Sequence, residues 1–89
     1  MNKSYFYENS NLISSRLRQL RQEAGLSQEE LAAQLQLLGV DLTQRLISKI
    51  ERNERFVKDY ELVCLCKVLR VTERELLEDC YQILASQEK

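Results

Sequence analysis

Two short segments predict where helices begin in this chain. Residues 27–30 have the sequence SQEE, and residues 72–75 have the sequence TERE. In such a capping box the Ser or Thr side chain accepts a hydrogen bond from the N–H of the last Glu, whose carboxylate accepts one from the backbone N–H of the Ser or Thr. Apolar residues at helical spacing follow both segments. Because the chain also has no proline and only two glycines, we expect an all-α fold and not a turn-rich β fold.

The first two of five expected helices precede residue 40. The first has an apolar face with helical spacing and ends at Gly25, because glycine readily adopts the left-handed conformation that ends helices. That face consists of Ile13, Leu17, Leu20 and Ala24. The second helix begins at the SQEE segment and ends at Gly39.

Three further helices are expected in the second half of the chain. The third covers residues 44–52, and either Thr43 or Asp41 can cap its start. Asn53 tolerates the left-handed conformation at its end. Asp59 is expected to be the N-cap of the fourth helix, and the fifth begins with the TERE segment.

Size and composition exclude several classes of function. A chain of 89 residues forms one domain with little room for a deep catalytic cleft. It has no histidine and no glycine-rich phosphate loop, so we expect no enzymatic activity, no cofactor and no common zinc site. Cys64, Cys66 and Cys80 are expected to be reduced core residues, with a redox switch as the alternative. No apolar run is long enough to span a bilayer or to act as a signal peptide, so we expect a cytoplasmic protein.

A helix over residues 44–52 would separate polar from apolar side chains. Its polar face consists of Gln44, Arg45, Ser48, Lys49 and Arg52, and its apolar face consists of Leu46, Ile47 and Ile50. Residues 43–58 contain five basic and two acidic side chains, although the net charge of the whole chain is −1. A solvated helix surface is the simplest interpretation. A polyanion-binding surface is the alternative, because screening over about 8 Å makes nearby charges matter more than the total.

Three segments occur in order between residues 12 and 77: RLRQLRQEAGLSQEELAAQL, LTQRLISKIERNER and LVCLCKVLRVTERELL. Together they resemble the Cro and phage-repressor helix-turn-helix family, also called XRE-type regulators. The resemblance implies a five-helix, lambda-repressor-like DNA-binding domain whose second helix crosses the DNA backbone and whose third helix lies in the major groove. It also implies two partners, the double-stranded DNA of an operator and a second copy of the chain in a homodimer.

The resemblance assigns roles to individual residues. The base-reading positions of the family correspond to Gln44, Arg45, Ser48 and Lys49. Gln can pair bidentately with adenine, and Arg or Lys can bind O6 and N7 of guanine. The implied phosphate contacts are Gln28, Thr43, Arg52, Asn53 and Arg55. A plain exposed residue of a first helical turn is the alternative for Gln28.

Scaffold positions follow from the same resemblance. Arg21 and Glu51 correspond to a partly buried salt bridge that joins the first helix to the third. The expected core consists of Leu17, Leu20, Leu31, Leu35, Leu42, Ile47, Ile50, Leu62, Leu65, Val68 and Leu76. Two features depart from the family pattern. The connection between the second and third helices is longer than usual, and Arg70 stands where glycine usually ends the fourth helix.

We therefore expect an N-terminal arm at residues 1–11, a DNA-binding domain at residues 12–84 and a C-terminal tail at residues 85–89. Six apolar residues near the two ends of the chain either form a dimer surface or close the core. They are Tyr5, Phe6, Tyr7, Tyr81, Ile83 and Leu84.

Two functions remain open at the level of sequence. The first is sequence-specific DNA binding by a bacterial or phage-type transcriptional regulator, expected to be a repressor. The alternative is a protein-interaction module of antitoxin-like or adaptor type, built on the same scaffold.

Overall fold

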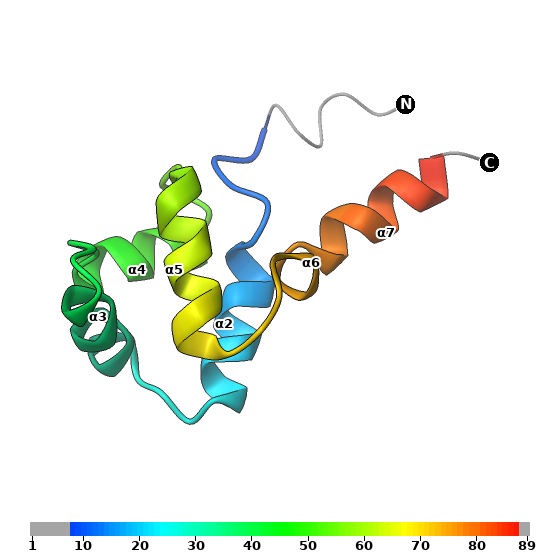
Figure 1. Cartoon of the computed structure of the whole chain (residues 1–89). Coiled ribbons are helices and arrows are strands. Elements are labelled where there is room, and N and C mark those ends of the chain that lie inside the picture. Colours follow the sequence, from blue (N-terminus) through cyan, green and yellow to red (C-terminus); the bar gives the residue numbers. More distant parts are fainter. Residues whose placement is uncertain (1–7, 88–89) are drawn as a thin grey trace.

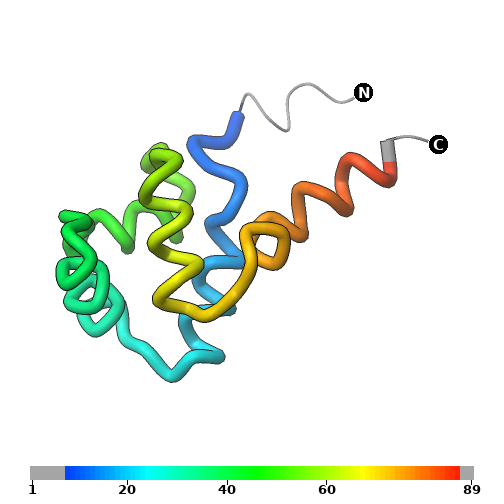
Figure 2. The backbone as a smooth tube through the Cα atoms, viewed as in Figure 1, coloured from blue at the N-terminus to red at the C-terminus, as the bar shows by residue number. Residues whose placement is uncertain are grey.

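The computed structural model describes residues 8–87, and this part of the chain contains helices and no strand. The helices are α2 (Ser14–Glu23), α3 (Gln28–Leu37), α4 (Gln44–Glu51), α5 (Asp59–Leu69), α6 (Glu73–Leu76) and α7 (Glu78–Gln87). The prediction of an all-α fold is confirmed. In Figure 1, α3 and α4 lie together on one side of the body, whereas α7 extends away from it on the opposite side, as the tube in Figure 2 also shows.

Both predicted capping boxes are present. The Ser27 Oγ accepts from the Glu30 N–H at 3.0 Å, and the Glu30 carboxylate accepts from the Ser27 N–H at 2.8 Å. At the start of α6, the Thr72 Oγ1 accepts from the Glu75 N–H at 3.0 Å, and the Glu75 carboxylate accepts from the Thr72 N–H at 3.3 Å. Each box satisfies N–H groups that have no partner within the helix.

The predicted helix ends are also confirmed. Gly25, Gly39 and Asn53 have φ angles of 72°, 82° and 61°, in the left-handed region. The connection between α3 and α4 covers residues 38–43. Arg70, with φ of 58°, occupies the same left-handed region at the end of α5. Unlike glycine, it has a Cβ atom, which makes this conformation sterically unfavourable.

Two predicted boundaries are wrong. The N-cap of α5 is Lys58 and not Asp59, because the Glu61 carboxylate accepts the Lys58 N–H at 2.9 Å and completes the cap one residue earlier. The fifth predicted helix is two helices, α6 and α7. Leu77 between them has φ of −98° and ψ of 12°, outside the α-helical range. Its carbonyl accepts from the N–H of Cys80 three residues ahead, which shifts the hydrogen-bond pattern and redirects the chain.

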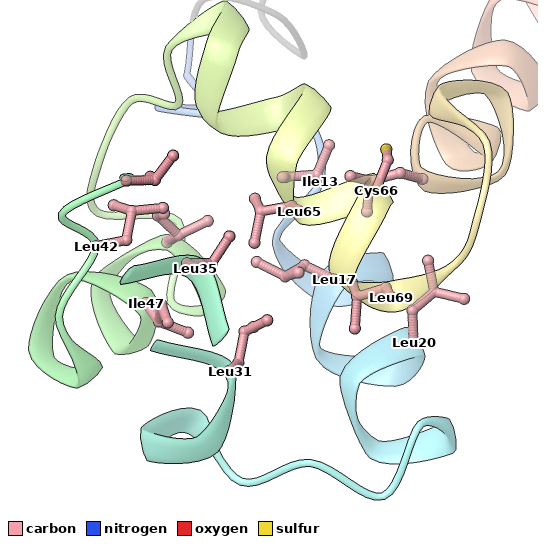
Figure 3. Close-up of a cluster of buried hydrophobic side chains, with 13 residues drawn as sticks. Ile13, Leu17, Leu20, Leu31, Leu35, Leu42, Ile47, Leu65, Cys66 and Leu69 are labelled. Carbon is pink, nitrogen blue, oxygen red and sulfur yellow. The ribbon is translucent and has the colours of Figure 1, made fainter. Parts of the chain in front are cut away.

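The core lies between α2, α3, α4 and α5. Figure 3 shows Leu31 and Leu35 of α3 pointing toward Leu17 of α2 and Leu65 of α5. The buried apolar residues are Ile13, Leu17, Leu20, Leu31, Leu35, Val40, Leu42, Ile47, Ile50, Leu65, Cys66, Leu69 and Leu76. This set includes every expected core residue except Leu62 and Val68, which are partly buried.

Ala24 and Val40 show where helical periodicity was incomplete as a guide to the core, whereas Cys66 is in the core as expected. Ala24 is exposed because it follows the last turn of α2. Val40, in the connection after α3, is buried although no helical pattern includes it. Cys66 is buried, and burial raises the pKa of its thiol to about 11, so the reactive thiolate is scarce near neutral pH.

Candidate nucleic-acid interface

The polar face of α4 points away from the body because the opposite face is fixed in the core. Ile47 and Ile50 are fully buried, and the Thr43 Oγ1 accepts from the Leu46 N–H at 3.3 Å, which caps the start of the helix. The predicted base-reading residues Gln44, Arg45, Ser48 and Lys49 are therefore on one exposed or half-exposed surface. We call this surface the outward face of α4.

Arg45 and Lys49 are available to bind a ligand. Among residues 8–87, neither side chain makes a hydrogen bond or ion pair, and they lie one helical turn apart on the outward face. A charged side chain without an internal partner remains hydrated and mobile at little cost. Both can therefore be reoriented toward a polyanion without breaking a hydrogen bond or ion pair within that range.

Arg52, at the end of α4, has weak surface partners. Its guanidinium pairs with the Glu54 carboxylate at 3.3 Å, and both side chains are about half exposed. It also donates to the Ser48 hydroxyl. An exposed ion pair of this kind contributes roughly 0–1 kcal/mol, so a phosphate can displace Glu54 at small cost.

A chain of hydrogen bonds joins α2, α3 and α4. Arg21 donates through Nε and Nη2 to the two carboxylate oxygens of Glu51, at 2.7 and 3.0 Å, and through Nη1 to the Leu26 carbonyl at 2.8 Å. The Gln28 Nε2 donates to Glu51 Oε1 at 3.0 Å. The Gln44 Nε2 donates in turn to Gln28 Oε1 at 2.7 Å. The sequence analysis gave these four residues three different roles. In the structure they form one hydrogen-bonded network.

The ion pair at the inner end of this network is buried. The side chains of Arg21 and Glu51 are 11% and 4% exposed. The hydrogen bond to Glu51 raises the pKa of Arg21 further above its ordinary value, despite the opposing effect of burial. This pair fixes the position of α4 relative to α2, and Gln28 and Gln44 extend it to the surface.

A shallow hollow lies between the starts of α3 and α4. It is lined by Arg21, Ser27, Gln28, Glu29 and Gln44. The N-terminal ends of two helices carry partial positive charge and free N–H groups, which favour an anion. The structure therefore places Gln28 and Thr43, two of the predicted phosphate contacts, at helix starts beside the outward face of α4.

Asn53 and Arg55, the other two predicted phosphate contacts, have hydrogen-bond partners within the fold. The Asn53 Oδ1 accepts from the backbone N–H groups of Ser10 and Asn11, at 2.9 and 3.1 Å, and its Nδ2 donates to the Asn9 side chain. Arg55 makes two hydrogen bonds to the Glu61 carboxylate, at 3.0 and 3.2 Å. Both side chains are therefore held by partners within the fold.

Sequence reasoning missed Asn11, which fastens the N-terminal segment to the end of α4. Its side chain is buried, donates to the carbonyls of Ile50 and Arg55 at 3.0 Å each, and accepts from the Ile13 N–H at 3.0 Å. A single asparagine before a helix gives no periodic signal. The described part of the predicted arm therefore packs on the domain, whereas Tyr5, Phe6 and Tyr7 lie outside the described residues.

Neither a metal-binding group nor a membrane-spanning helix is found in the part of the chain that the structure describes. It contains no group of three or more His, Cys, Asp or Glu side chains that could hold a metal ion. None of its helices is long and apolar enough to cross a membrane.

Comparison with known families agrees with this geometry. A family model described as a helix-turn-helix domain matches residues 12–78. The matched region extends from just before α2 to the first residue of α7, and it includes both α3 and α4. The comparison with curated proteins gave no match.

Proposed function

Because the chain belongs to the helix-turn-helix domain family, we propose that it is a sequence-specific DNA-binding regulator of transcription that inserts α4 into the major groove. The outward face of α4 is the observation that carries this proposal. It presents Arg45 and Lys49, which make no ion pair among residues 8–87, beside Gln44, whose amide is already held in place. We expect the protein to act in the cytoplasm as a repressor wherever its operator overlaps a promoter.

Base reading is assigned to the start and middle of α4. Arg45 and Lys49 carry donors that match O6 and N7 of guanine, and Gln44 carries a donor and an acceptor that match adenine. The Ser48 hydroxyl can donate to either base type, since the hydrogen bond from Arg52 uses only its oxygen lone pair. We therefore expect a half-site that contains at least one guanine.

Phosphate binding is assigned to residues that flank the outward face of α4. Gln28 and Thr43 stand at the starts of α3 and α4, and Arg52 stands at the end of α4. Contacts on both sides of the groove would fix the orientation of the helix without contributing sequence preference.

We propose a homodimer that forms through α7. Tyr81 and Leu84 are 42% and 39% exposed on this projecting helix, so they do not close the core. Ile83, also on α7, is half-buried. Burial of these residues against a second copy would place two α4 helices on two half-sites of one duplex.

Selection from a random pool of DNA duplexes tests the proposed function. We expect enrichment of a two-fold symmetric site with half-sites about 34 Å apart. The selected duplex and a scrambled duplex would then be titrated at several salt concentrations. Weak binding that is equal for both duplexes and disappears at high salt would show that the protein is attracted only to the phosphates. That result would contradict the proposal.

One observation favours the second candidate function, a protein-interaction module. Phe56, Tyr60 and Val63 are 76%, 52% and 54% exposed, and Tyr60 and Val63 lie one turn apart on the outer side of α5. An exposed apolar stripe is a feature of protein-binding surfaces. If this candidate is correct, Phe56→Ser with Val63→Ser would abolish a biological effect that Arg45→Ala with Lys49→Ala leaves intact.

A further inference from the structure

We propose that Arg16 is a positioning residue that sets the spacing between the two half-sites that a dimer reads. It acts by keeping the junction between α6 and α7 bent. This inference rests on the proposed function and deepens it, because it requires two copies of the chain to join through α7. It concerns the distance between half-sites, which the base-reading residues of α4 do not determine.

The α6 side of this junction is anchored to the body. Leu76, the last residue of α6, is fully buried in the core. On the other side of the junction, α7 extends away from the body (Figure 1). A change at the junction would therefore turn α7 relative to the body, together with any second copy that is bound to α7.

Arg16 binds the backbone at the point where the helix is interrupted. In a continuous α-helix the Glu75 carbonyl would accept from the N–H of Asp79, four residues ahead. Here the Arg16 Nε of α2 donates to that carbonyl at 3.0 Å. The Arg16 side chain thus takes the place of a donor from α7, which favours the interrupted helix over a continuous one.

Two further contacts restrain the first turn of α7. The Ser15 hydroxyl of α2 donates to the Asp79 carboxylate at 3.4 Å. The Arg74 guanidinium of α6 lies over the Tyr81 ring, 4.1 Å from its centroid. The Arg74 Nε is also 3.8 Å from the Glu78 carboxylate. Because these contacts come from both α2 and α6, each of the two neighbouring helices restrains the direction of α7.

Small rotations at the junction have large effects because α7 is long. Its ten residues span about 15 Å. A rotation of about 20° would move the far end of α7 by about 5 Å, which exceeds the rise of about 3.4 Å for one base pair. A spacing change of one base pair also turns one half-site by about 35° around the duplex. A dimer with a fixed junction should therefore bind one spacing well, whereas a dimer with a free junction should tolerate several.

Titration of duplexes that differ only in spacing tests this inference. The selected half-sites are kept, and the spacer between them is lengthened or shortened by one base pair. We expect the wild type to lose about tenfold or more in affinity for each such change. In Arg16→Ala we expect these differences to fall to about threefold or less, because the Glu75 carbonyl is released and the junction can straighten. Base preference within each half-site should not change.

Gln19→Ala is the matched control. Gln19 is an exposed residue of α2 whose Nε2 donates to Glu23 of the same helix at 2.9 Å, and among the described residues it makes no hydrogen bond to α6 or α7. This variant should have the spacing preference of the wild type. Circular dichroism and sedimentation velocity would check that each variant is folded and dimeric.

Ser15→Ala with Arg74→Ala keeps the inference testable if Arg16→Ala does not fold. This double variant removes the other two contacts of the junction and should also broaden the spacing preference. A spacing preference as sharp as that of the wild type in folded, dimeric Arg16→Ala would overturn the inference. A wild type that recognises its half-sites but binds every spacing equally would overturn it too. A wild type without any sequence preference would instead contradict the proposed function, which separates the two failures.

Discussion

Glu61 is a buried carboxylate whose ionisation should make stability depend on pH. Burial raises the pKa of Glu61, but hydrogen bonds from Arg55 and from the Lys58 N–H outweigh burial and hold this pKa below the ordinary value of 4.5. The folded state therefore binds fewer protons than the unfolded state. The ionised Glu61 side chain contributes its full stabilisation above about pH 4.5. This contribution is lost as the pH falls through the lower pKa that Glu61 has in the folded state.

Urea unfolding of Glu61→Gln between pH 7 and pH 3 checks this prediction. We expect the variant to be less stable than the wild type at neutral pH, and the difference to shrink as acid protonates Glu61 in the wild type. Glu54→Gln removes an exposed partner and should differ little from the wild type at any pH. A difference for Glu61→Gln that stays constant over this range would show that ionisation of Glu61 is not linked to folding.

The exposure of a side chain was predictable where spacing along one helix decides which residues are buried. The outward face of α4 follows from the alternation of Gln44, Arg45 and Lys49 with Ile47 and Ile50. Single polar residues that are buried by distant partners give no such pattern. Asn11 bonds to carbonyls about 40 residues away, and no local rule connects them.

The end of α5 carries a residue that is poorly suited to its backbone conformation. Arg70 is exposed and has φ of 58° and ψ of 43°, a conformation that costs a residue with a side chain roughly 1–2 kcal/mol. Glycine avoids this cost but loses more entropy on folding. We expect Arg70→Gly to raise the free energy of unfolding by up to about 1 kcal/mol.

Chemical denaturation of Arg70→Gly measures this effect, and Asn53→Gly is the matched variant. Asn53 has a similar φ of 61° but uses its side chain to hold residues 9–11. The same substitution should therefore destabilise the protein at position 53 and stabilise it at position 70. Destabilisation at both positions would mean that the left-handed conformation of Arg70 is not strained.

Helix starts and ends were predictable because caps are local. Ser27, Thr43 and Thr72 each sit within three residues of the N–H group they accept from. The break at Leu77 was not predictable, since the apolar pattern continues through it and the TERE segment indicates only where a helix begins. The N-cap of α5 was misplaced because Asp59 is a common N-cap residue, whereas Glu61 supplies the cap from within the helix.

The shape of the whole molecule suggests how two copies would meet. Since α7 extends from the body with Tyr81 and Leu84 exposed, Tyr81→Glu with Leu84→Glu should convert a homodimer to a monomer. Sedimentation velocity measures the mass, and circular dichroism measures the retained helix. Replacing exposed Leu37, which lies at the end of α3, by Glu is the control. A wild type that sediments as a monomer at all concentrations would contradict the proposed dimer.

The central claim is that α4 reads DNA through Arg45 and Lys49. Both side chains are outside the core and, within residues 8–87, make no hydrogen bond or ion pair, so Arg45→Ala with Lys49→Ala should leave the unfolding temperature nearly unchanged. Titration of the selected and scrambled duplexes with this double variant is the most direct measurement. We predict at least about a tenfold loss of affinity for the selected duplex, and loss of its preference over the scrambled one. Undiminished binding and preference in a folded double variant would show that these two residues do not read the site.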